Sequence, residues 1–210
     1  MALGLDFGTG SAGDGESLLS AFTKINTFLL TTTKLSAGDL TINDVRVGRG
    51  VGKSVNNTVV GNNALAVNTG INNTAIGNSA LAANTNGGYN TAVGISALQA
   101  NTGGTANTAI GNGSSFTNQG GNSNTSLGSD SLFYNVSGSN NTAIGKGALQ
   151  NSTGSENTAI GYNAGNGVTT ESNVTCVGYN AQAIASNQVV IGNDAVTSTL
   201  LKGCLLYTSP

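Results

Sequence analysis

Apolar and polar residues alternate in a five-residue pattern that recurs along most of the chain. The clearest copies read Asn-Thr-Ala-Ile-Gly, at residues 73–77, 107–111, 141–145 and 157–161, with close variants between them. The closing glycines are spaced by 16, 17, 17, 17, 17, 16, 17 and 14 residues. A period this regular is typical of a solenoid built from stacked rungs. We expect these glycines to be structural turn residues: Gly61, Gly77, Gly94, Gly111, Gly128, Gly145, Gly161, Gly178 and Gly192.

A second apolar pair follows most of these glycines at a fixed distance. It is Ala-Leu, three and four residues after the glycine, as in Ala64-Leu65 and Ala97-Leu98. Segments rich in Asn and Gly, which favour tight corners, fill the remaining positions. So short a repeat leaves no room for a helix, and Asn, Thr and Gly are poor helix formers. The sequence therefore predicts an all-β parallel β-solenoid of about nine rungs of 14–17 residues. Each rung would be a short strand, a corner, a second short strand and a corner.

The alternation also predicts which side chains fill the interior. In Asn-Thr-Ala-Ile-Gly, Thr and Ile share one side of the strand, while Asn, Ala and Gly share the other. We expect the bulky Ile76, Ile110, Ile144 and Ile160 to lie inside the rungs with the leucines. The small alanine side would then allow close approach of another wall or another chain. Stacking would also place like residues over like, giving ladders of Asn, Thr, Ala and Ile.

The N-terminal part of the chain carries a helical pattern instead. Leu18, Phe22, Ile25 and Leu29 are spaced by 4, 3 and 4 residues and would form one apolar stripe on a helix. A helix over 14–34 would either cap the end of the roll or form a trimerising seam with other chains.

The whole chain is thereby divided into five parts. We read "VRVG" (45–48) as the first, irregular rung, because it has the form of the end of a repeat. The expected parts are a flexible N-terminus (1–13), the helix (14–34), a linker (35–44), the roll (45–196) and a truncated lead-out (197–210).

A Gly-rich run, "GRGVGKS" at 48–54, ends in Gly-Lys-Ser as a phosphate-binding loop does. Such a loop needs its first glycine five residues before Gly52, and that position is Val47. No apolar strand ending in Asp follows in the sequence to hold magnesium. We therefore interpret the run as part of the start of the roll.

The composition argues against most enzyme chemistry. The chain has no His, which excludes Ser-His-Asp and Cys-His arrangements, and only 8% of its residues are charged. Between 57 and 178 the charged residues are Asp130, Lys146, Glu156 and Glu171, which we interpret as solvated corner charges rather than a glycosidase pair.

Two cysteines suggest neither a disulfide framework nor a metal site. We expect no catalytic activity, no cofactor and no metal; the net charge of −2 offers no attraction to nucleic acid, and no apolar run is long enough to insert into a membrane.

A column of threonines at the second position of the pattern raises one alternative, an ice-binding solenoid. Threonine also stacks well along parallel strands for purely structural reasons. A flat ice-binding face would need a second threonine column, and here the next residue on the same side is Ile or Val. The column consists of Thr58, Thr74, Thr91, Thr108, Thr125, Thr142, Thr158 and Thr175.

The repeated "NTAIGxxAL" resembles the YadA-like head repeat of trimeric autotransporter adhesins over about residues 45–196. That resemblance implies a left-handed parallel β-roll, a homotrimer of chains packed side by side, and an adhesive or spacer role. Most repeats here are two or three residues longer than in that family, and the extra residues fall in Asn/Gly corners. Wider corner loops are therefore expected.

Two other segments are similar to parts of phage structural proteins. "GDGESLLSAFTKINTFLL" (13–30) is similar to a module at the start of many phage tail-fibre and virion proteins. "NDAVTSTLLKG" (193–203) looks like the lead-out before a C-terminal chaperone in phage fibres. The N-terminus also lacks the basic and apolar regions of a secretory signal, which favours a phage fibre over an exported adhesin.

These observations predict a non-enzymatic structural or adhesive fibre segment, the shaft or receptor-facing head of a phage tail fibre located in the virion. A bacterial trimeric adhesin head at the cell surface is the alternative. The expected partners are two further copies, tail or baseplate proteins at the N-terminus, and a glycan or protein of the host surface. The corners at 114–124, 132–140 and 162–173 vary most, and their Phe133, Tyr134 and Tyr162 are the candidate receptor contacts.

Overall fold

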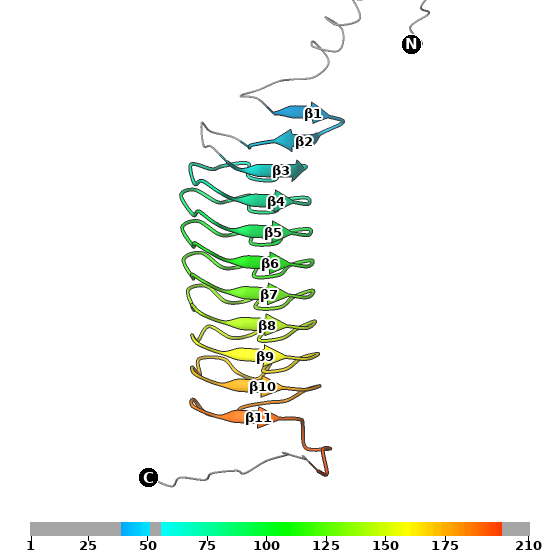
Figure 1. The fold of residues 1–210 in the computed structure, drawn as a ribbon, viewed down its shortest axis with the longest axis vertical. Helices are drawn as coiled ribbons and strands as arrows, with labels where there is room; N and C mark the ends of the chain where they lie inside the picture. Colours follow the sequence, from blue (N-terminus) through cyan, green and yellow to red (C-terminus); the bar gives the residue numbers. More distant parts are fainter. Residues whose placement is uncertain (1–38, 51–55, 199–210) are drawn as a thin grey trace, which may run out of the picture.

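The computed structural model describes residues 39–50 and 56–198, and it shows an all-β solenoid. Its strands lie one above another in chain order and form a single 11-stranded sheet along the long axis (Figure 1). The N-terminal helix expected over 14–34 and the segment 1–13 lie outside the described residues, as does most of the lead-out. The strands are β1 (Leu40–Ile42), β2 (Val45–Gly48), β3 (Thr58–Gly61), β4 (Thr74–Ile76), β5 (Thr91–Val93), β6 (Thr108–Ile110), β7 (Thr125–Leu127), β8 (Thr142–Ile144), β9 (Thr158–Ile160), β10 (Thr175–Val177) and β11 (Val189–Ile191).

Parallel pairing joins β3 to β11 in the register that the repeat predicts. Thr108 of β6 pairs with Thr91 before it and Thr125 after it, and the same register holds from β3 to β10. Like residues therefore stack over like, which confirms the solenoid and its period. The nine parallel strands form about eight turns of the solenoid.

The start of the sheet differs from the expected irregular rung. Strand β2 pairs antiparallel with β1 and also antiparallel with β3, so 40–48 forms a hairpin at the N-terminal end of the roll. The buried Asp39 carboxylate holds this end together. It accepts hydrogen bonds from the backbone amides of Arg49 and Gly50, the latter at 2.7 Å, and lies 3.9 Å from Nε of Arg46. The similarity of "VRVG" to a repeat reflects strand propensity, not strand direction.

Each rung has one strand rather than the two we expected. The Ala-Leu segment forms turns, and its leucines adopt the left-handed region; Leu65, Leu81 and Leu98 have φ of 43°, 51° and 49°. Their amides still bond to the next rung, as in Leu81 N–H to the Ala97 carbonyl at 3.0 Å. The left-handed turn directs each leucine into the interior. The sequence repeat showed that these positions are apolar, but it gave no sign of this backbone conformation.

The structure reverses our assignment of the two strand faces. Ala75, Ala109 and Ala159 are fully buried, whereas the isoleucine that follows each of them points outward. Our expectation that Ile76, Ile110, Ile144 and Ile160 fill the rung was therefore wrong. The leucines of the turns already occupy the interior, and the small alanines of the strands are buried with them.

Buried asparagines bind the rungs to one another at the corners. In a typical rung, the Nδ2 atoms of Asn107 and Asn118 both donate to the Gly121 carbonyl, at 2.8 and 3.1 Å. Oδ1 of Asn107 accepts from the backbone amide of Asn124 in the next rung, at 2.9 Å. No buried side-chain nitrogen or oxygen in the described residues lacks a partner. These hydrogen bonds offset the cost of desolvating so many buried amides.

The closing glycines lie directly above one another, which excludes any side chain. A Cβ at Gly111, whose φ is 135°, would lie 2.6 Å from the carbonyl oxygen of Gly128. The same contact, to the next glycine along, occurs at Gly61, Gly77, Gly94, Gly128, Gly145 and Gly161.

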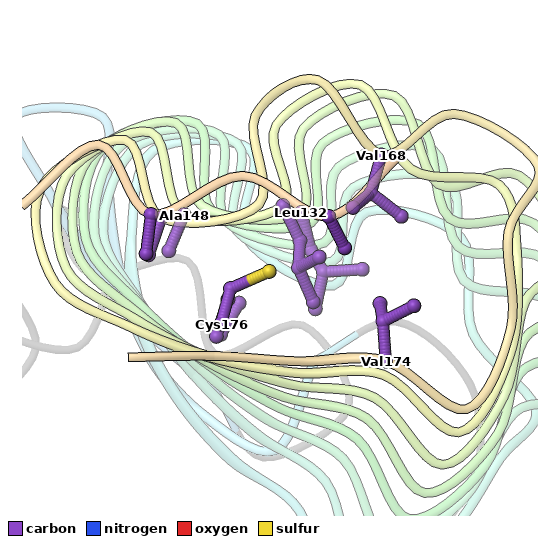
Figure 2. Close-up of a cluster of buried hydrophobic side chains, with 11 residues drawn as sticks. Leu132, Ala148, Val168, Val174 and Cys176 are labelled. Atoms are coloured by element: carbon purple, nitrogen blue, oxygen red, sulfur yellow. The ribbon is translucent and has the colours of Figure 1, made fainter. Parts of the chain in front are cut away.

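Polar side chains divide the apolar core near its middle. One cluster extends from Val59 to Ala109 and the other begins at Leu132. Figure 2 shows side chains of the second cluster, including Val168, Val174 and Cys176, projecting into the interior of the roll. Between the two clusters, four buried hydroxyls bond to one another at 2.7 to 3.1 Å. This serine cluster is Ser114, Ser115, Ser126 and Ser131.

Candidate functional site

The outward side of the strands forms a continuous surface, here called the outer face. It consists of the threonine column (Thr58 to Thr175) and, two residues on in each strand, an aliphatic column. Ile110, typical of the second column, is 39% exposed, and its buried neighbour Ala109 belongs to the opposite side of the strand. No charged residue occurs in any strand from β3 to β11. The aliphatic column is Val60, Ile76, Val93, Ile110, Leu127, Ile144, Ile160, Val177 and Ile191.

The predicted receptor contacts fall into two separate aromatic stacks. Phe133 stacks on Phe116 at 4.9 Å between ring centroids, and Tyr134 packs against Phe133 in a T-shaped arrangement with centroids 4.7 Å apart. Tyr162 stacks instead on Tyr179 of the next rung, at 5.5 Å and an interplanar angle of 11°. Phe133 is thus partly covered by two other rings, whereas Tyr134 and Tyr162 are about half exposed.

Sequence reasoning did not select Tyr179 as a candidate contact, although it is 62% exposed. The signal was available, since Tyr162 and Tyr179 occupy the same position of consecutive repeats, one residue after the closing glycine. A parallel solenoid necessarily brings two such rings together.

A shallow groove lies beside the segments that follow β8, β9 and β10. Side chains from three consecutive rungs line it, and most of them are amides. Gln182 is held at both ends: its Nε2 donates to the Asn163 carbonyl at 2.7 Å and its Oε1 accepts from the Gly167 amide at 2.6 Å. The lining residues are Asn151, Asn163, Asn166, Gly167, Glu171, Asn180, Gln182, Ala183 and Ile184.

Glu171 supplies the carboxylate of this groove. Its Oε2 accepts hydrogen bonds from the backbone amides of Thr169 at 2.6 Å and Thr170 at 3.0 Å. Hydrogen bonds from its own backbone amide and from that of Thr169 lower the pKa of Glu171. The side chain is therefore a fixed anion at neutral pH.

Two other groups that could carry chemistry have structural environments. Cys176 replaces alanine in the buried column, and burial raises the pKa of its thiol, so it packs as a small apolar side chain. Glu156 is exposed at a corner. Among residues 39–50 and 56–198, no three His, Cys, Asp or Glu side chains lie close enough to hold a metal ion. No helix in the same residues is long and apolar enough to cross a membrane.

No family model, curated protein or solved structure matches the chain. The structure offers two candidate surfaces. One is the uncharged outer face along the strands, and the other is the amide-lined groove with exposed tyrosines at the corners.

Proposed function

We propose that the chain is a non-enzymatic structural and adhesive fibre segment that works as a homotrimer. The observation that supports this proposal is the aliphatic column of the outer face. It runs from β3 to β11, a length of about 38 Å for eight steps of about 4.8 Å. Exposed apolar surface of this extent on a soluble domain usually marks an interaction site.

A further copy of this chain is the partner that fits the outer face best. Side chains on this face repeat with the spacing of the rungs, so a second surface can interlock along its length only if it has the same spacing. A parallel solenoid has that spacing, and the chain itself is one. The absence of charge from strands β3 to β11 removes any electrostatic penalty for burying this face against itself.

The setting that we propose is the tail fibre of a phage, as shaft or receptor-facing head. Its support is the similarity of the N-terminal segment to phage fibre modules, together with the head-like repeat. A bacterial trimeric adhesin head would use the same roll and the same outer face. The roll acts mechanically in either setting: a stiff rod holds several weak contacts at fixed spacing, and avidity supplies the strength of attachment.

Multi-angle light scattering on the full chain tests the assembly. We expect the mass of three chains, about 62 kDa for three copies of 20.7 kDa. Ile110→Lys together with Ile144→Lys places charge in the aliphatic column and should yield folded monomers, because burying an unpaired charge is costly. Asn112→Lys, at an exposed corner of the β6 rung, is the control and should remain trimeric.

Two results would contradict the proposal. One is a monomeric wild-type chain with an intact β spectrum. The other is a trimer that survives both lysines in the column, since the contact would then lie on another face.

The outward threonine column keeps ice binding as a second candidate. The threonines do face solvent at regular spacing, as an ice-binding surface requires, but an aliphatic column accompanies them. Ice binding needs this face free, whereas trimerisation buries it, so the two functions exclude each other. Thermal hysteresis measured by osmometry, together with a monomeric mass, would favour ice binding.

A further inference from the structure

The groove after β8, β9 and β10 combines amide side chains from three rungs with a carboxylate. Each of the two stacked tyrosines, Tyr162 and Tyr179, is followed directly in the chain by an asparagine that lines the groove. Polar side chains from three rungs and an exposed aromatic pair thus belong to the same part of the structure. We propose that this region binds a neutral oligosaccharide. The inference deepens the adhesive role proposed above and rests on it.

The groove retains hydrogen-bonding capacity that the fold does not use. Among the described residues, no hydrogen bond engages the side-chain amide of Asn163 or Asn180. The hydrogen bonds that Glu171 accepts from Thr169 and Thr170 all go to Oε2, so no other described residue bonds to Oε1. Two amides and one carboxylate oxygen together supply both donors and acceptors, and a sugar hydroxyl can bond to either.

The walls of the groove are held in place before any ligand arrives. Gln182 is fixed at both ends by backbone contacts, and Asn151 donates to both oxygens of Asn166, at 2.8 Å to Oδ1 and 3.0 Å to the carbonyl. These bonds cross between rungs and restrain the corner segments. Corner segments that are already restrained lose less conformational entropy when a ligand binds.

The aromatic pair supplies the apolar half of the site. The exposed fractions of Tyr162 and Tyr179 are 46% and 62%, so each ring is open on part of its surface. A pyranose has apolar C–H faces and a polar rim of hydroxyls, and it therefore matches rings beside amides. Tyrosine also presents this contact with few rotatable bonds.

The charges at the site favour a neutral sugar over an acidic one. Glu171 remains ionised, and its free oxygen is one of the binding atoms. A sialic acid or a sulfated sugar would bring a second anion against it. Lys146 occupies the position of the two tyrosines one rung earlier, but Glu171 is the charged residue that lines the groove.

The other aromatic stack does not offer the same combination. Phe133 packs against both Phe116 and Tyr134 and is only partly exposed. Neither aromatic stack lines the groove itself, but Tyr162 and Tyr179 directly precede lining residues in the chain, and none of Phe116, Phe133 and Tyr134 does. Of the contacts predicted from sequence, Tyr162 therefore belongs to the proposed site, whereas Phe133 and Tyr134 do not.

Variants for the test can be chosen from residues that the fold already accepts. Asn62, Asn78 and Asn112 occupy the position of the two tyrosines in other rungs, so Tyr162→Asn with Tyr179→Asn should preserve the roll. The control is Tyr89→Ala. Tyr89 is 64% exposed at a different corner, and alanine occupies its position one rung later with the same left-handed φ. Glu171→Gln tests the carboxylate separately.

The labelled full-length chain is applied to printed neutral oligosaccharides, to sialylated and sulfated forms of the same cores, and to a peptide array. We expect binding to a subset of the neutral glycans and a loss of more than about tenfold in apparent affinity for the double tyrosine variant, as for a central aromatic contact. The Tyr89→Ala variant should bind like the wild type, and Glu171→Gln should bind more weakly.

Four results would overturn the inference: no bound glycan, binding to acidic glycans or peptides alone, equal binding by the double tyrosine variant, or an equal loss in the Tyr89→Ala control. Light scattering on the same samples separates this failure from failure of the fibre proposal. A trimer that binds no sugar contradicts only the glycan site, whereas a monomer contradicts the fibre segment itself.

Discussion

Removing one buried asparagine tests what holds the rungs together. Asn107 is almost fully buried, and its side chain makes two hydrogen bonds. Replacing it with alanine leaves the Gly121 carbonyl with the bond from Asn118, and Oδ1 of Asn90 keeps the backbone amide of residue 107. The group that loses its only partner is the backbone amide of Asn124.

The loss of stability in Asn107→Ala can be worked out from the backbone amide of Asn124, which is left without a hydrogen-bond partner. A buried N–H without a partner costs about 1–3 kcal/mol. The space left by the missing amide group adds to this cost, because the stacked rungs above and below cannot collapse into it. We therefore expect Asn107→Ala to lower the free energy of unfolding by about 2–4 kcal/mol.

Equilibrium unfolding in urea, followed by circular dichroism at one protein concentration, measures the loss. The control is Asn112→Ala, in the same rung and five residues along. Its side chain is exposed and bonds to no other described residue, so the change should stay within about 0.5 kcal/mol. If both variants unfold at the same urea concentration, the buried amides do not stabilise the stack as argued here.

Two further predictions concern the interior. Ala109→Leu and Ala143→Leu should each cost about 1–3 kcal/mol in urea unfolding, because both alanines are fully buried against packed rungs; wild-type stability in these variants would mean that the interior has spare volume. A variant that restores the repeat residues throughout the serine cluster (Ser114→Ala, Ser115→Leu, Ser126→Ala and Ser131→Ala) should have a higher unfolding midpoint. It buries one more leucine and leaves no buried hydroxyl without a partner. Ser126→Ala alone should lower that midpoint, because it removes a partner of two buried hydroxyls; a rise in both variants would contradict this account.

The period of the glycines was enough to predict the fold. Because a parallel stack aligns every rung with the next, the spacing of Gly94 and Gly111 in the sequence translates directly into their contact in space. Once the period was known, the register of the strands followed from it. The same reasoning predicted that asparagines would stack, although not which atoms they would bond to.

The orientation of the strand could not be predicted with the same certainty. Alternation establishes that Ala109 and Ile110 face opposite ways, but it does not say which of them faces inward. Because isoleucine is the more hydrophobic of the two, it was expected to face inward. The interior also receives the leucine of each rung from a left-handed turn, and that conformation, unusual for leucine, was not visible in the sequence. The leucine fills the space, so the smaller residue must face it.

The candidate site was predicted in part. Tyr162 was identified from the variability of the corners, but its partner Tyr179 and the groove depend on how successive corners meet. Three rungs contribute to the groove, and Gln182 occupies the position, four residues after the closing glycine, where most earlier rungs have leucine. A sequence repeat shows which positions are equivalent, but it does not show where a departure from the repeat opens a surface.

The reversed strand faces connect the fold to the proposed assembly. Because alanine faces inward, the largest aliphatic residues of the strands are left on the outer face, where a monomer would expose them to water. The groove, in contrast, is lined entirely by residues that lie between strands. Three chains packed through their strands would therefore cover the apolar column and leave the amide-lined corners open on each copy. Under the two proposals, assembly and sugar binding would use different parts of the same rung. Each trimer would then present three identical sites at fixed separation, the arrangement from which weak individual contacts gain avidity.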